Sequence, residues 1–223
     1  MPKGLFISFE GIDSSGKKTQ ASLLAEYLKK RGFDVVEIGF PAYHTVFGSH
    51  VAAFLRGEYG KKEELPAEVA ALLFAVDRYQ FKENIRNWLR EGKIIVCNRY
   101  TQSAMAFEGT LNKDKEEFIK WVGAVESRLP QPDIIFLLDM PTSVSRKLLE
   151  KREGKDYLKG KDKDVFEEDL KFQEAVRQTY LELSKGRKWV VIECFNGEEA
   201  KTIEEVHGEV VKKVENILIK KYK

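Results

Sequence analysis

Short apolar segments alternate along the chain with longer segments in which apolar residues recur every three to four positions. The short segments are compact and rich in β-branched and aromatic residues, which is typical of buried strands. They predict five strands, at Leu5–Glu10, Val35–Ile38, Ile94–Asn98, Ile134–Asp139 and Trp189–Glu193.

The longer segments have the period of amphipathic helices. They predict helices at about Lys17–Arg31, Thr45–Arg56, Ala67–Glu91, Glu116–Leu129, Thr142–Lys151, Phe166–Lys185 and Ile203–Lys220. Strands and helices that alternate in this way are the signature of βαβ units. We therefore expect an α/β fold with a doubly wound, five-stranded parallel sheet and helices on both of its faces.

One segment, Arg152–Lys163, has a different composition. Its sequence REGKDYLKGKDK is rich in Gly and Lys and nearly devoid of apolar residues, which predicts an exposed, mobile loop between two helices. We find no internal repeat and no Ser/Gly/Pro-rich linker between two cores. Residues 1–223 are therefore predicted to form a single domain, which their number permits.

The composition narrows the class of protein. Hydrophobic residues make up 43% and charged residues 33% of the chain, as in soluble globular proteins. The 38 basic and 36 acidic residues leave a net charge of +2, which argues against a dedicated binder of nucleic acid or membrane surfaces. No apolar run approaches the roughly 18 residues of a membrane helix, and the N-terminus lacks the features of a secretory signal.

The two cysteines, Cys97 and Cys194, lie in apolar stretches that are predicted as strands. Two thiols are too few for a disulfide framework or a four-ligand metal site. We therefore expect buried, reduced thiols and a cytoplasmic protein.

The residues after the first strand have the spacing of a phosphate-binding loop. They fit the pattern G-x-x-x-x-G-K, and an amphipathic helix follows. The glycines permit backbone angles that turn successive N–H groups toward a phosphate, and the helix N-terminus and Lys17 add positive charge. The residues predicted to bind the phosphates of ATP are Gly11, Ile12, Asp13, Ser14, Ser15, Gly16, Lys17, Lys18 and Thr19.

The loop departs from the usual pattern directly after Lys17. The motif normally has a Ser or Thr hydroxyl there as a ligand of Mg²⁺, and this chain has Lys18, with Thr19 one place later. An ammonium group cannot bind a metal ion, and the next helical residue points about 100° away. We therefore expect phosphates, water and carboxylates to hold Mg²⁺, with Asp13 and Glu10 as the nearest candidates.

Four further motifs narrow the choice among phosphate-loop proteins. They are Phe40-Pro41 after the second strand, LLFAVDRYQ at Leu72–Gln80, NRYTQSAMAF at Asn98–Phe107 and LPQPD at Leu129–Asp133. With these motifs, in this order, the sequence resembles the thymidylate kinase family from about Phe6 to Leu183. The resemblance implies the transfer of the γ-phosphate of ATP to dTMP, which gives dTDP and ADP, with Mg²⁺ as cofactor.

The resemblance also implies roles for the acceptor site. Arg99 is expected to bind the acceptor phosphate, Phe74 to stack on the thymine ring and Arg78 to hydrogen-bond a carbonyl oxygen of the base. Without the resemblance, Phe74 is better explained as a core residue, and the alternative for Arg99, less favoured than phosphate binding, is a surface ion pair. The full set of residues expected at dTMP is Asp13, near the 3′-hydroxyl, Phe40, Pro41, Phe74, Arg78, Arg99, Ser103, Phe107, beside the deoxyribose, and Glu167.

The family pattern is broken at two further positions. Asn98 stands where the family usually has Asp, and Tyr43 stands where many members have an Arg that binds the acceptor phosphate. The acceptor phosphate is already a nucleophilic oxyanion, so the chemistry needs no general base. These departures bear on turnover, on the arrangement of the metal and on the base accepted.

The loop 152–163 fits this chemistry as a lid that excludes water. Its cations include Arg152, whose guanidinium suits phosphate oxygens. The expected catalytic residues are thus Lys17, Arg99 and Arg152.

Three hypotheses on function remain at this point. The first is a dTMP kinase, which by the resemblance would be a homodimer. The second is a kinase for another pyrimidine monophosphate (dUMP, UMP or CMP), and the third is a nucleotide-binding switch with weak catalysis, which Lys18 and Asn98 would suit.

Overall fold

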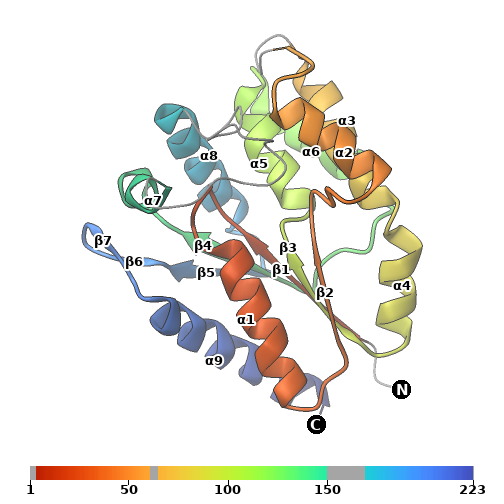
Figure 1. Ribbon diagram of the computed structural model, residues 1–223, viewed down its shortest axis with the longest axis vertical. Helices are drawn as coiled ribbons and strands as arrows, with labels where there is room; N and C mark the ends of the chain where they lie inside the picture. Colours follow the sequence, from red (N-terminus) through yellow and green to blue (C-terminus); the bar gives the residue numbers. More distant parts are fainter. Residues whose placement is uncertain (1–3, 61–64, 150–168, 223) are drawn as a thin grey trace.

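The computed structural model of the chain describes residues 4–60, 65–149 and 169–222. Its central feature is a parallel sheet with the strand order β2-β3-β1-β4-β5 (Figure 1). The strands are β1 (Leu5–Glu10), β2 (Val35–Gly39), β3 (Ile94–Asn98), β4 (Ile134–Asp139) and β5 (Trp189–Glu193). The five predicted strands and the doubly wound parallel sheet are therefore confirmed.

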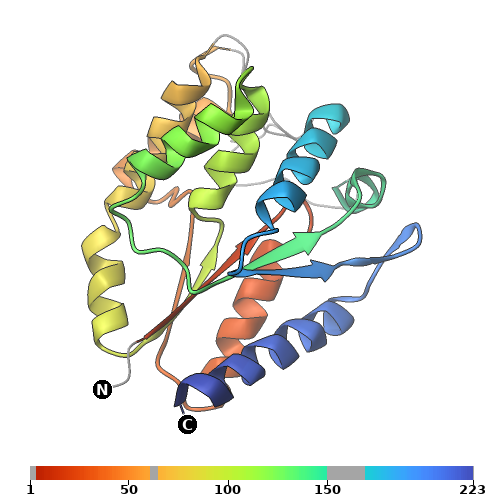
Figure 2. The ribbon, with the colours of Figure 1, turned by 180° about the vertical axis from the view of Figure 1, so that it is seen from behind.

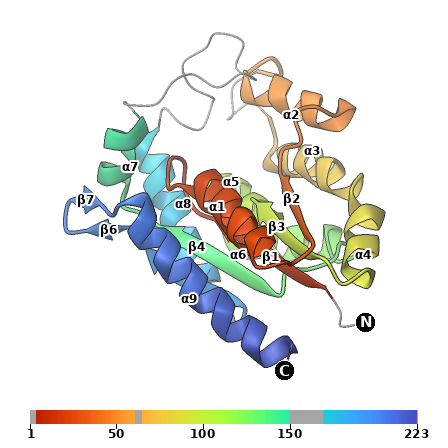
Figure 3. The ribbon, with the colours of Figure 1, turned by 60° about the horizontal axis from the view of Figure 1, so that its bottom comes forward.

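Helices cover both faces of this sheet. The helices in the described residues are α1 (Lys17–Lys30), α2 (Val46–Leu55), α3 (Ala67–Tyr79), α4 (Lys82–Arg90), α5 (Thr101–Leu111), α6 (Lys115–Val125), α7 (Thr142–Leu149), α8 (Leu170–Leu183) and α9 (Ile203–Tyr222). On one face α1 and α9 lie side by side (Figure 3). The opposite face, seen in Figure 2, carries α5 and α8, with α6 packed on α5.

The buried apolar residues follow this layering. One core lies under α1 and α9, where Leu24 and Val210 meet Ile7 of β1 and Phe136 of β4. A second core lies on the other face of the sheet. It contains Phe54 of α2, Ala106 and Phe107 of α5 and Val176 of α8. The central strands β1, β3 and β4 are almost entirely buried. Helices cover them on both faces, so most of their side chains are apolar in both directions, which explains the compact apolar runs in the sequence.

The prediction of one long helix at Ala67–Glu91 is wrong, because the structure has two helices there, α3 and α4. At the break, the N–H of Phe81 donates to the carbonyl of Arg78 at 3.1 Å. This bond spans three residues instead of the four of an α-helix, so the turn is tighter. The side chain of Gln80 donates to Thr45, and Phe81 packs edge-on against Phe40 at 5.6 Å. Thr45 and Phe40 belong to a distant part of the chain. The helical period of the sequence therefore continues across the break, and no local residue pattern marks it.

Helix α5 is absent from the sequence-based prediction. Most of its residues are buried, including Ala104, Ala106, Phe107 and Glu108. A helix that is covered on nearly all sides shows no amphipathic period, which is the reason that periodicity missed it.

The remaining differences are smaller. Helix α6 ends at Val125, four residues before the predicted end, and α8 runs from Leu170 to Leu183. A short hairpin, β6 (Phe195–Asn196) and β7 (Glu199–Ala200), was not predicted. The predicted lid, 152–163, lies outside the described residues.

Candidate active site

The phosphate loop leaves β1 at the carboxyl edge of the sheet. Phe9 of β1 pairs with Asn98 of β3, so the loop and Arg99 emerge from neighbouring strand ends. Gly11 has a φ of 143°, and a Cβ there would lie 2.7 Å from the carbonyl oxygen of Leu138. Only glycine therefore fits at this position, which holds the loop tightly against β4.

The loop ends in a helix terminus that is open to an anion. Gly16, with a φ of 88°, caps α1 without any side-chain hydrogen bond to the first N–H groups of the helix. Lys17 is buried, and its Nζ donates to the carbonyl oxygen of Ile12 and lies 3.4 Å from Ser15 Oγ. Lys18 and Thr19 are exposed at the cavity wall. Backbone N–H groups and two lysines thus surround a place for phosphates.

A cavity of about 1610 Å³ joins this loop to the predicted acceptor residues. The predicted residues that line it are Asp13, Ser14, Gly16, Lys17, Lys18, Thr19, Phe40, Pro41, Phe74, Arg78, Arg99, Ser103 and Phe107. Gly11, Ile12 and Ser15 form the buried back of the loop. Arg152 and Glu167 lie outside the described residues.

Arg99 is part of the cavity lining. It adopts a left-handed backbone conformation, with φ 64°, directly after β3. Its guanidinium forms an ion pair with Asp13, lies 3.3 Å from Ser103 Oγ and stacks 4.9 Å from the ring centre of Phe107. Burial lowers the pKa of Arg99, but Asp13, Tyr180, Glu10 and Tyr43 together outweigh this effect, Asp13 most of all, and raise the pKa above its ordinary value. The group is therefore a fixed cation.

Gln173 of α8, which sequence reasoning missed, holds Asp13 from the other side. Its amide nitrogen donates to Asp13 Oδ2 at 2.8 Å, and its amide oxygen accepts the N–H of Asp13 at 3.2 Å. Asp13 is thus held between a cation from β3 and an amide from α8. No local pattern in an amphipathic helix marks such a residue.

Glu10 lies beneath the cavity rather than in its lining. It is fully buried, and its carboxylate accepts hydrogen bonds from the N–H of Tyr100 at 2.7 Å, from Ser103 Oγ at 2.7 Å and from Tyr180 Oη at 3.0 Å. Burial raises the pKa of Glu10, and the hydrogen bond from Ser103 opposes that rise. The carboxylate of Glu10 therefore holds the start of α5 in place.

Arg78 and Phe74 of α3 form the far wall. Arg78 is only 1% exposed, and its Nε donates to Glu126 Oε1 at 3.0 Å. Burial lowers the pKa of Arg78, but the neighbouring Glu126 carboxylate raises it more, so the guanidinium stays charged. Phe74 packs edge-on against Phe54 at 6.1 Å. Both side chains line the cavity.

The Phe40-Pro41 turn is held by the residue next to Arg78. The turn contains a cis peptide bond. Asp77 Oδ2 accepts the N–H of Ala42 at 2.9 Å, and Asp77 Oδ1 accepts from Gln80 at 2.8 Å. One turn of α3 therefore fixes both a wall of the cavity and the loop across from it.

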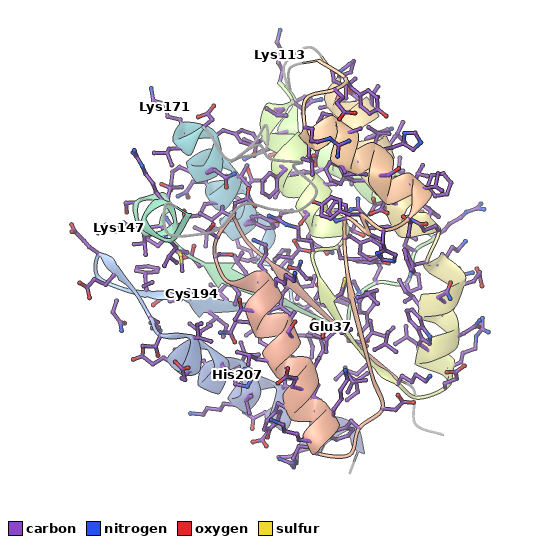
Figure 4. The ribbon with its side chains drawn as sticks, viewed as in Figure 1. Glu37, Lys113, Lys147, Lys171, Cys194 and His207 are labelled. Carbon is purple, nitrogen blue, oxygen red and sulfur yellow. The ribbon has the colours of Figure 1, made fainter. Side chains whose placement is uncertain are left out.

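The two other departures from the family pattern also lie in the cavity lining. Tyr43 replaces a cation, and its partly buried ring belongs to the apolar core. Asn98 has a buried Oδ1 with no hydrogen-bond partner among the residues that the structure describes. Glu37 of the edge strand β2, labelled in Figure 4, also lines the cavity. Its carboxylate accepts a hydrogen bond from Ser22.

Comparisons with known proteins point to one family. The thymidylate kinase family model matches residues 9–210. A thymidylate kinase of Fervidobacterium nodosum is 33% identical over 210 residues, which cover 93% of this chain and 97% of that protein. A probable thymidylate kinase of Methanocaldococcus jannaschii is 34% identical over 219 residues, or 97% of this chain and 99% of that one.

Solved structures are similar over the same length. The thymidylate kinase of Candida albicans, described as having broad substrate specificity, has a TM-score of 0.72 at 25% identity, over 97% of this chain and 93% of that one. The thymidylate kinase of Ehrlichia chaffeensis has a TM-score of 0.69 at 26% identity, over 96% and 100%.

Proposed function

The chain belongs to the thymidylate kinase family, which phosphorylates dTMP to dTDP, and on that premise we propose how its own residues carry out the reaction. The phosphate loop, residues 11–19, binds the phosphates of ATP. The walls formed by Phe74, Arg78 and Arg99 bind dTMP. The observation that carries this proposal is the single cavity that connects the two sets of residues.

Phosphoryl transfer depends on the relative position of the two substrates and on the neutralisation of their phosphate charges. An oxygen of the dTMP phosphate attacks the γ-phosphorus of ATP, and the bond to the β-phosphate oxygen breaks to release ADP. The acceptor oxygen already carries negative charge, so no base has to remove a proton. Lys17 and Arg99 hold the two phosphates in line and offset their repulsion. To bind a phosphate, Lys17 Nζ exchanges its hydrogen bond to the carbonyl oxygen of Ile12 for one to a phosphate oxygen.

The base and sugar of dTMP contact the far wall. Phe74 stacks on the thymine ring, and the buried Arg78 donates to a carbonyl oxygen of the base. The Phe40-Pro41 turn closes the cavity from the opposite side. Asp13 and Ser103 bind near the sugar and the acceptor phosphate, and Phe107, packed against Arg99, leaves little room for a 2′-hydroxyl.

The oxygen ligands in the lining of this cavity suit Mg²⁺. The described residues hold no cluster of three or more His, Cys, Asp or Glu side chains suited to a metal. Mg²⁺ in kinases needs only one or two protein ligands besides phosphates and water. Asp13 and Asn98, whose Oδ1 has no hydrogen-bond partner among the described residues, offer oxygen ligands in the cavity lining, whereas Glu10 lies outside that lining. When bound, the ion would offset charge on the β- and γ-phosphates.

The remaining parts of the proposal concern the whole chain. We take residues 1–223 as one kinase domain, with Arg152 and the lid, 152–163, closing over ATP and Glu167 near the sugar or metal. We expect the enzyme to work in the cytoplasm, and its two free, buried thiols suit a reducing compartment. Among the described residues, no helix has the length and apolar character needed to cross a bilayer.

A second copy of the chain is the proposed partner. Val69, Leu72 and Val76 expose 42%, 43% and 41% of their surface along one side of α3. Positions spaced by three and four residues share a helix face. A contiguous apolar face of this kind marks an interaction surface, and we propose that it forms the interface of a homodimer.

The direct test is an assay of ADP release with dTMP, dUMP, UMP, CMP, GMP and AMP as acceptors, with dTDP identified as product. We expect a preference for thymine or uracil deoxynucleotides. The absence of such a preference would contradict the acceptor assignment. Tight binding of ATP without dTDP formation at any Mg²⁺ concentration would instead favour the nucleotide-binding switch.

A further inference from the structure

Lys18 stands at the position where the usual phosphate-loop motif has a hydroxyl that binds Mg²⁺. Its side chain is exposed at the cavity wall, and the mechanism above gives it no role of its own. Within residues 4–60, 65–149 and 169–222, it forms no ion pair. An ammonium group without an acidic partner at the wall of an anion-binding cavity is available to an anionic ligand.

The contacts of α1 with its neighbour β2 show which way Lys18 faces. The two elements lie side by side (Figure 1). Ser22 follows Lys18 by four residues and therefore lies on the same face of the helix. The hydroxyl of Ser22 donates to Glu37 of β2. Lys18 thus lies on the side of α1 that faces β2, one turn nearer to the carboxyl ends of the strands.

Asn98 lies under the same end of α1. Side chains alternate between the two faces of a sheet. Ile94 and Val96 of β3 belong to the core under α1, so Asn98, two residues further, points to that face as well. Its Oδ1 is buried and has no hydrogen-bond partner among the residues described. Beside it, a Cβ on Gly39 of β2 would lie 3.4 Å from Asn98 Cβ. Lys18, Gly39 and Asn98 thus line one corner of the cavity.

The departures at Lys18 and Asn98 change the charge of this corner in the same direction. In phosphate-loop proteins, a hydroxyl after the loop lysine and an aspartate hold Mg²⁺ on the β- and γ-phosphates. Here an ammonium stands in place of the hydroxyl and an amide in place of the carboxylate. Each exchange adds one positive charge, and together they add the charge that one Mg²⁺ would supply. The ammonium also repels a metal cation at this corner.

We propose that Lys18 is a catalytic residue that replaces the metal at this corner, where its ammonium donates to oxygens of the β- and γ-phosphates of ATP and to Asn98 Oδ1. The inference rests on the proposed ATP site and deepens it. The flexible four-carbon side chain permits Lys18 to turn to these acceptors. Of the two oxygen ligands offered to Mg²⁺, Asn98 is then taken by the ammonium, which leaves Asp13. ATP is consequently bound with little help from Mg²⁺.

The test measures the affinity of the full-length protein for ATP by isothermal titration calorimetry, once with excess EDTA and once with excess Mg²⁺. By linkage, the ratio of the two dissociation constants also gives the change in the affinity of ATP for Mg²⁺ on binding to the protein. We expect similar constants in the two conditions for the wild type.

Lys18→Ser restores the usual hydroxyl and removes the cation. It should weaken ATP binding in EDTA by about 10- to 100-fold, the scale of a lost hydrogen bond to a charged group. The loss should be smaller with Mg²⁺, because the hydroxyl can bind the ion. The double variant Lys18→Ser, Asn98→Asp should widen this difference, because its carboxylate repels ATP without metal and binds Mg²⁺.

Two further variants separate a direct contact of Lys18 from a general effect of charge. Lys30→Ser removes an exposed lysine from the last turn of the same helix, and it should leave both dissociation constants unchanged. Lys18→Arg keeps a cation at the corner and should retain most of the affinity for ATP in EDTA.

Two outcomes for Lys18→Ser would overturn the inference. One is an unchanged affinity for ATP in EDTA, and the other is an equal loss with and without Mg²⁺. Lys17→Ala separates this failure from failure of the ATP site. If Lys17→Ala weakens ATP binding while Lys18→Ser binds ATP like the wild type, only the inference on Lys18 is lost. If Lys17→Ala leaves the affinity for ATP unchanged, the phosphate loop is misassigned as the ATP site.

Discussion

The guanidinium of Arg99, at the end of β3, forms an ion pair with the carboxylate of Asp13 in the phosphate loop. In the proposed site the pair joins the two halves of the cavity, since Asp13 belongs to the phosphate loop and Arg99 is assigned to the acceptor phosphate. Gln173 holds the same carboxylate from α8. The position of the cation between the two substrates therefore depends on three elements that are far apart in the sequence.

Loss of the Asp13 carboxylate should misplace Arg99. We expect Asp13→Ala to lower kcat/KM for dTMP by about 100-fold, the scale of a displacement of about 1 Å in a catalytic group. Gln173→Ala removes a support but no charge, so its effect should be smaller. Steady-state kinetics with Asp34→Ala, an exposed carboxylate paired with Lys93, provides the control. An unimpaired Asp13→Ala enzyme would refute this role.

Arg78→Ala should damage dTMP binding far more than ATP binding. We expect its KM for dTMP to rise by about 10-fold or more, with the KM for ATP little changed. Equal losses for both substrates would count against a contact with the base. Arg86→Ala, which removes a half-exposed arginine paired with Glu83, is the matched control and should change neither constant.

Arg78→Ala should also destabilise the fold. It leaves the buried Glu126 carboxylate without its partner, which typically costs about 3–5 kcal/mol. The double variant Arg78→Ala, Glu126→Ala should regain part of the free energy of unfolding in urea while dTMP binding stays weak. If stability and dTMP binding recover together, the defect in binding arises from unfolding.

Asp77→Ala should loosen the loop opposite Arg78. The N–H of Ala42 would lose its buried acceptor, which costs about 1–3 kcal/mol, and the KM for dTMP should rise because the Phe40-Pro41 turn is no longer fixed. Gln80→Ala leaves the bond between Asp77 and Ala42 intact and should have the smaller effect. Chemical denaturation and dTMP kinetics measure the two consequences. A Gln80→Ala variant impaired more than Asp77→Ala would contradict the assignment.

Glu108 should make stability depend on pH. Its pKa is raised to about 8 in the folded protein, above its ordinary value of 4.5. The stability linked to its proton is therefore fully present below the unfolded pKa and is lost as the pH rises through about 8. Glu108→Gln should accordingly gain in Tm relative to the wild type between about pH 5 and about pH 8.5. A constant difference in Tm across this range would contradict the shift.

The apolar face of α3 should control assembly. We expect Leu72→Glu to convert a dimer to a monomer, because it places a charge in the proposed interface. Ile219→Glu changes a side chain that is equally exposed but lies on α9, and it should leave the mass unchanged. Light scattering after size-exclusion chromatography measures both. A dimer that survives Leu72→Glu would move the interface elsewhere.

Local sequence patterns are sufficient to predict the five strands, the phosphate loop and the family. Each of these depends on neighbouring residues: a compact apolar run, a glycine spacing, or a motif such as the one around Arg99. The amphipathic helices were also found, since their period is local. The resemblance then assigned Arg78 and Phe74 to the acceptor, and both reach the cavity.

How these parts are held together depends on contacts between residues that are distant in the sequence. The break between α3 and α4 depends on Thr45 and Phe40, and the burial of α5 on all sides removed the pattern that would have revealed it. Gln173 at Asp13, Glu126 at Arg78 and Glu108 in the cavity wall gain their meaning from partners on other elements. A polar residue acquires its charge state and its role from its burial and its neighbours, and these exist only once the chain has folded.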